Sequence, residues 1–119
     1  MDFSRYKKER FVIYGYSEKT GQYAPFIGCN DPKDAFTAAR IRAKQLKNYY
    51  PVDENGIEFN PTDVRVFEIP MDKVVAIYNE KGLVLIDHKL GHPQKHPKMN
   101  DVSASVQDLE IDWWKHNGY

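Results

Sequence analysis

One amphipathic helix set between strand-like segments constrains the fold of this chain more than any other feature. Asp31 can cap a helix, Pro32 fits its first turn, and Pro51 stops it. The helix is therefore predicted over residues 31–50. Apolar side chains recur within it at spacings of three and four, as Phe36, Ala39, Ala43, Leu46 and Tyr50. This spacing predicts one buried stripe and leaves Ile41 on the opposite side of the helix.

Segments rich in β-branched and aromatic residues lie on both sides of this helix. The expected strands are residues 11–16, 23–29, 64–69, 74–78 and 83–86. Pro25 cannot donate to a strand ladder, so the second strand is expected at a sheet edge or a bulge. The pattern predicts an α+β fold: an antiparallel sheet of about five strands with one long amphipathic helix packed on it.

The chain after residue 101 fits two structures. Helical spacing relates Val102, Val106, Leu109 and Trp113, and Ser105 with Asp108 resembles a capping pair. Leu109, Ile111 and Trp113 also fit the alternation of a strand. We favour a short C-terminal helix.

The composition narrows the class of protein. A length of 119 residues with 41% hydrophobic residues is suited to a single domain, residues 1–119, with its own core. Seventeen basic residues balance seventeen acidic ones, which argues against nucleic-acid binding through net charge. Neither a membrane span nor a secretory signal is recognised. The single cysteine excludes an internal disulfide, so we expect a cytoplasmic protein.

The sequence holds no coherent set of catalytic groups and no cofactor motif. Cys29 precedes the predicted helix, but Asp31 and Asp34 beside it would oppose a thiolate. We therefore expect Cys29 to be a small core residue. No glycine-rich phosphate loop and no serine in a nucleophile elbow is found. The prediction is a non-enzymatic protein without a catalytic site or a cofactor.

Three histidines provide the first alternative. His88, His92 and His96 are spaced four apart, with Asp87 and Asp101 nearby as oxygen ligands. Glycine and proline residues between them oppose a continuous helix, so a metal site would need the loop to fold around the ion. The preferred interpretation is a solvated loop that holds no metal. The alternative is a metal-dependent nuclease or other hydrolase that uses the His88–His96 loop.

Nucleic-acid binding is the second alternative. It would use an aromatic surface on the first hairpin and the basic flank of the helix, formed by Tyr14, Tyr16, Tyr23, Arg40, Lys44 and Lys47. Aromatic residues on strands more often pack beneath a covering helix. Together with the zero net charge, this argues against a nucleic-acid partner.

Protein recognition is the class that remains. Trp113 and Trp114 are adjacent, so one ring is expected to face outward, and Tyr119 follows closely. Tryptophan and tyrosine are enriched at binding hot spots. Trp113, Trp114 and Tyr119, with the outward Ile41, are therefore the predicted partner contacts. The alternative is that both tryptophans close the core. A homodimer through the edge strand marked by Pro25 is also possible.

A family resemblance adds to this prediction. The chain resembles small accessory proteins encoded by bacteriophages in its hairpin, amphipathic helix and many Tyr and Lys residues. The segment that carries the resemblance is RFVIYGYSEKTGQYAPFIGCNDPKDAFTAARIRAKQL, about a third of the chain. The resemblance implies an inhibitor or adaptor that blocks a host enzyme or defence protein by occupying its surface, in the host cytoplasm.

Overall fold

The computed structural model describes residues 1–87, 93–95 and 106–119, and these form one sheet with helices on one side. The strands are β1 (Phe11–Tyr16), β2 (Tyr23–Cys29), β3 (Asp63–Glu68), β4 (Lys73–Asn79), β5 (Gly82–Asp87) and β6 (Pro93–Lys95). The α-helices are α1 (Pro32–Ala43) and α2 (Val106–His116), and short 3-10 turns are η1 (Ser4–Tyr6) and η2 (Leu46–Asn48).

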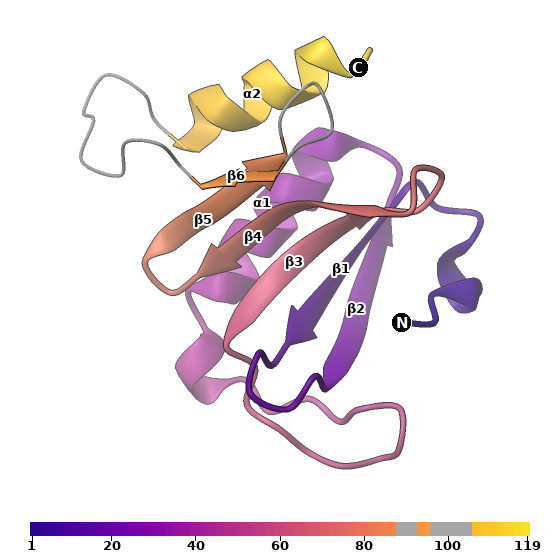
Figure 1. The fold of residues 1–119 in the computed structure, drawn as a ribbon, viewed down its shortest axis with the longest axis vertical. Helices are drawn as coiled ribbons and strands as arrows, with labels where there is room; N and C mark the ends of the chain where they lie inside the picture. The colour runs from indigo at the N-terminus through magenta and orange to yellow at the C-terminus, as the bar shows by residue number, and fades with distance from the viewer. Residues whose placement is uncertain (88–92, 96–105) are drawn as a thin grey trace.

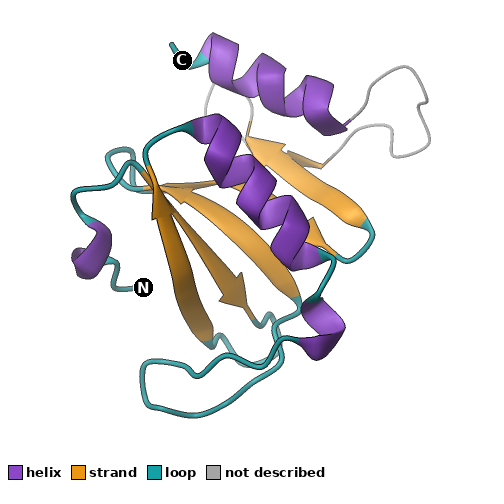
Figure 2. Cartoon of the chain, turned by 180° about the vertical axis from the view of Figure 1, so that it is seen from behind, coloured by secondary structure: helices purple, strands orange, loops and turns teal. Residues whose placement is uncertain are grey.

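The strands form one antiparallel sheet in the order β2-β1-β3-β4-β5-β6. Helix α1 crosses one face of this sheet, and α2 lies beside α1 at the β5 end (Figures 1 and 2). The predicted α+β class is confirmed, with its antiparallel sheet, its long helix and its C-terminal helix. The three-residue strand β6 was not predicted, because its proline-punctuated sequence has no strand pattern.

The edge position of β2 confirms the interpretation of Pro25. Strand β2 is the first strand of the sheet, and its register against β1 shifts where Ile13 pairs with Ile27 but Tyr14 pairs with Pro25. Phe26 is the extra residue of this bulge. A proline is tolerated here because an edge strand does not need every backbone donor.

Helix α1 begins where the sequence predicts and ends earlier. The Asp31 carboxylate accepts a hydrogen bond from the backbone N–H of Lys33 at 2.8 Å, as an N-cap does. The helix ends at Ala43, and the Asn60 amide then donates to the carbonyl oxygens of Leu46 and Tyr49 at 2.7 and 2.9 Å. Asn60 thus binds carbonyl groups beyond the end of α1, where the chain is no longer α-helical, and α1 does not reach residue 50.

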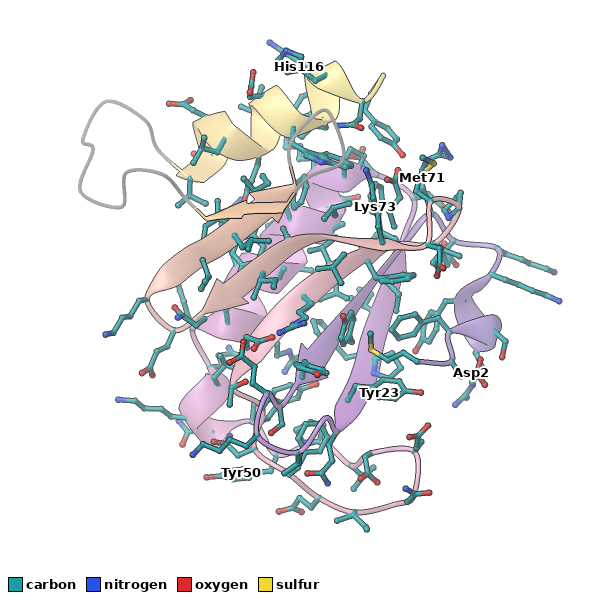
Figure 3. All side chains as sticks on the ribbon, viewed as in Figure 1. Asp2, Tyr23, Tyr50, Met71, Lys73 and His116 are labelled. Carbon is teal, nitrogen blue, oxygen red and sulfur yellow. The ribbon has the colours of Figure 1, made fainter. Side chains whose placement is uncertain are left out.

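The predicted stripe is correct except at its end. The other four residues of the stripe are buried: Phe36, Ala39, Ala43 and Leu46. Leu46 lies beyond the end of α1, in η2, which keeps its side chain directed at the sheet. Tyr50 is 55% exposed and lies toward the loop at the far end of the molecule, so its assignment to the stripe was wrong (Figure 3). Ile41 is exposed, as predicted.

Apolar side chains fill both faces of the sheet, since successive residues of a strand point to opposite sides. The core on the α1 side includes Phe11, Ile13, Phe36, Val64, Val66 and Trp113. A second core on the opposite face contains Phe3, Val12, Tyr14 and Tyr23. The N-terminal segment covers this second core, where the sequence suggested a helix over the hairpin tyrosines.

We expect Leu46→Ala to lower the free energy of unfolding by about 2–5 kcal/mol, because it leaves a cavity beneath η2. Ile41→Ala is the matched control on the exposed side of α1 and should cost far less, since its side chain is 55% exposed. Urea titration of both variants measures the difference. Equal losses would show that the buried face of this segment is assigned wrongly.

Candidate functional site

Helix α2 packs on the core through the face that helical spacing predicts. Val106 and Leu109 contact the core from its edge, and Trp113 enters it with 3% of its surface exposed. The Trp113 ring meets that of Phe36 edge-on, with centroids 5.4 Å apart, and stacks on that of Tyr119 at 6.0 Å. Trp113 is therefore a core residue, and its assignment as a partner contact was wrong.

Tyr119 is fixed in place by polar contacts as well as by this stacking. Its hydroxyl donates to a carboxylate oxygen of the buried Glu68 at 2.9 Å and accepts a hydrogen bond from Nε of Arg10. The Arg10 guanidinium lies 5.2 Å from the centre of the same ring. Burial raises the pKa of the Tyr119 phenol, so the hydroxyl keeps its proton at neutral pH and continues to donate.

An open cleft of about 430 Å³ separates the start of α1 from the end of α2. We call it the aromatic cleft, and its lining residues are Asn30, Asp31, Pro32, Lys33, Trp114 and Tyr119. Two of the predicted contact residues, Trp114 and Tyr119, thus line one site. Ile41 lies two turns farther along α1, about 12 Å from Lys33 at the usual helical rise, and does not line it.

Two polar side chains of the aromatic cleft already form hydrogen bonds within the chain. The Asp31 carboxylate already caps α1, and the Asn30 side-chain oxygen accepts from the Arg10 backbone N–H at 3.0 Å. The sequence suggested Trp114 and Tyr119, but residues 30–33 carried only helix-start signals. Their place in the cleft depends on how α2 docks.

A buried polar cluster fixes that docking. Glu110 of α2 is 4% exposed, and its carboxylate oxygen Oε2 accepts from the Tyr78 hydroxyl of β4 at 2.7 Å and from Arg40 Nε of α1 at 2.9 Å. Burial raises the pKa of Glu110 above its ordinary value. Burial, and then the Glu110 carboxylate, raise the pKa of Tyr78 well above its ordinary value, so its hydroxyl remains a donor. We call Arg40, Tyr78 and Glu110 the buried cluster. Sequence reasoning missed it.

We expect Tyr78→Phe to destabilise the protein by about 1.5–3 kcal/mol, because it removes a buried hydrogen bond to a carboxylate. Tyr14→Phe is the matched control. Tyr14 is equally buried, yet in the described part of the chain its hydroxyl has no hydrogen-bond partner. Its removal should be neutral or slightly stabilising in a urea titration. Similar losses for the two variants would contradict this assignment of partners.

The surface proposed for nucleic acid does not assemble. Tyr14 and Tyr23 are buried, with their rings 5.1 and 5.8 Å from that of Phe3. Tyr16 is partly exposed, but the Arg65 guanidinium covers its ring at 4.0 Å. On the helix flank, Arg40 is paired with Glu110. Bases would therefore find no row of open aromatic rings on this hairpin.

The predicted metal ligands His88, His92 and His96 lie outside the described residues. Among the residues that are described, no three histidine, cysteine or carboxylate side chains come together as a metal site. The fourth histidine, His116, lies on the outer side of α2, with Nδ1 2.7 Å from the carbonyl oxygen of Asp112 (Figure 3).

Cys29 packs partly buried at the margin of the α1-side core, which agrees with its predicted role. Burial raises the pKa of its thiol, and the carboxylates of Asp34, Glu9 and Asp31 raise it further. The thiol is therefore held neutral, and the environment disfavours a nucleophile.

Comparison with known proteins found no matching family model, no similar curated protein and no similar solved structure. Neither α-helix of the described residues is long and apolar enough to cross a membrane.

Proposed function

We propose that this chain is a non-enzymatic protein-binding module that contacts its partner through the aromatic cleft. The observation that carries the proposal is the pairing of Trp114 and Tyr119 at a single open cleft of about 430 Å³. Tryptophan and tyrosine contribute disproportionately to protein interfaces because they bury a large apolar area and also offer a polar atom.

The rigidity of the cleft supports the same function. Tyr119 is held by Glu68, Arg10 and the Trp113 ring, and α2 is held by the buried cluster. Side chains that are ordered before binding lose less conformational entropy when the partner arrives. By its resemblance to bacteriophage accessory proteins, the chain is proposed to act as an inhibitor or adaptor that occupies the surface of a host or defence protein.

We expect Trp114→Ala to abolish capture of the partner from a lysate of the native host, as identified by mass spectrometry. Ile41→Ala is the matched control, since it removes an exposed apolar side chain that does not line the aromatic cleft. Circular dichroism shows whether both variants stay folded. Retention of the same partner by Trp114→Ala, or turnover of a small molecule without any partner, would contradict the proposed function.

A further inference from the structure

We propose that the buried cluster of Arg40, Tyr78 and Glu110 positions Trp114, so that it determines the shape of the aromatic cleft and adds little stability beyond what apolar residues in its place would provide. This inference rests on the proposed function for its biological meaning. Its structural content does not, because the position of Trp114 can be measured without a partner. Glu110 is thus a positioning residue for the contact site.

Helical geometry connects the two sites. Glu110 and Trp114 are four residues apart on α2, so their side chains leave the helix on the same face, one turn apart. Glu110 reaches α1 and β4, while Trp114 lines the aromatic cleft together with Pro32 and Lys33 at the start of α1. A rotation or a slide of α2 would therefore move both side chains together.

The apolar contacts of α2 alone specify its position less strictly. Val106, Leu109 and Trp113 pack on the core through apolar surface, whose burial is not directional. The two hydrogen bonds of Glu110 have fixed donor atoms, Tyr78 Oη and Arg40 Nε, on two different elements. Thr37 also accepts from Arg40 Nη2 at 3.2 Å, which orients the guanidinium. Together these bonds are satisfied in one register of α2.

The energetics of buried ion pairs point to the same division of roles. Desolvation of a buried carboxylate offsets much of what its partners contribute, so replacing a whole buried cluster by apolar residues is often neutral or stabilising. The best supported use of such polar groups is to select one arrangement among several. A cluster that holds a contact helix in register serves that purpose here.

The test uses the full chain and a variant in which the cluster is apolar throughout, Arg40→Met with Tyr78→Phe and Glu110→Met. We expect its free energy of unfolding to equal or exceed that of the unchanged protein. In ¹H–¹⁵N NMR spectra, the indole resonance of Trp114, assigned by its loss in Trp114→Phe, should shift or split. Amide hydrogen exchange in α2 should accelerate about tenfold or more.

Two further variants keep the test decisive if the triple variant does not fold. Glu110→Gln retains an oxygen that accepts from Tyr78 and Arg40, so the Trp114 resonance should stay single and close to its original position. Tyr78→Phe should shift it, whereas Tyr14→Phe on the opposite face of the sheet should not. A single, unshifted Trp114 resonance in both the triple variant and Tyr78→Phe would overturn the inference. If the resonance shifts but partner capture is unaffected, the positioning role stands and the proposed function fails.

Discussion

Replacing Trp113 by alanine is expected to lower the free energy of unfolding by about 3–5 kcal/mol. Its indole is the part of α2 that enters the α1-side core, where it contacts Phe11, Phe36 and Tyr119. Removing it leaves a large cavity between two helices and the sheet, and it also takes away the surface on which Tyr119 stacks. The aromatic cleft should lose one wall as a result.

The neighbouring tryptophan provides the control for this variant. Trp114 is only partly buried, so Trp114→Ala should cost clearly less in urea or thermal unfolding. The two variants should therefore differ in which property they affect, stability or partner capture. Trp113→Ala acts mainly on stability, and Trp114→Ala acts mainly on partner capture. Equal losses of stability would mean that the two rings share the core.

Replacing Arg40 by alanine is the second variant with a large expected effect, about 3–5 kcal/mol at neutral pH. It leaves the Glu110 carboxylate buried with only the Tyr78 hydroxyl as a partner among the described residues. The Arg40 side chain is itself 26% exposed. The loss of stability therefore comes from the Glu110 carboxylate, which stays buried without its charged partner, rather than from removal of the guanidinium. Lys44→Ala, at the exposed position directly after this helix, is the control and should be close to neutral.

The loss should depend on pH in a defined direction. Burial already raises the pKa of Glu110 in the folded protein, and removal of Arg40 raises it further. A carboxyl group with a raised pKa in the folded state favours folding below its ordinary pKa, and this contribution is lost as the pH rises through the raised value. The Arg40→Ala deficit should therefore be smaller at about pH 5 than at about pH 7.5. Urea titrations at both values measure it, and a larger deficit at the lower pH would contradict the role of Glu110.

Local signals in the sequence were sufficient for most of the fold. Asp31 and Pro32 act within one turn of α1, and Pro25 acts within its own strand, so their effects could be predicted without the tertiary structure. The path of the chain after α1 could not, because the Asn60 amide that binds the carbonyl groups of Leu46 and Tyr49 belongs to a later loop that no helix signal relates to them. Tyr50 was misplaced for this reason.

The candidate site was predicted only in part for the same physical reason. Adjacent tryptophans indicate that one ring faces outward, but they do not indicate which one. The choice depends on the docking of α2, and therefore on Glu110, which is buried although charged side chains are mostly exposed. Only the hydrogen bonds from Tyr78 and Arg40 reveal why it is buried. These two residues come from elements that the sequence does not relate.

The contacts of α2 also bear on how fast this chain can fold. The first sheet contacts join neighbouring strands, and the β1–β2 hairpin closes a short loop. The hydrogen bond between Arg10 and Tyr119 instead joins residues 109 positions apart, and Trp113 seals a core that begins at Phe11. The entropy of closing so long a loop must be overcome before these contacts stabilise anything, and a high share of such contacts slows folding. We therefore expect docking of α2, the helix that shapes the contact surface, to be a slow step in folding.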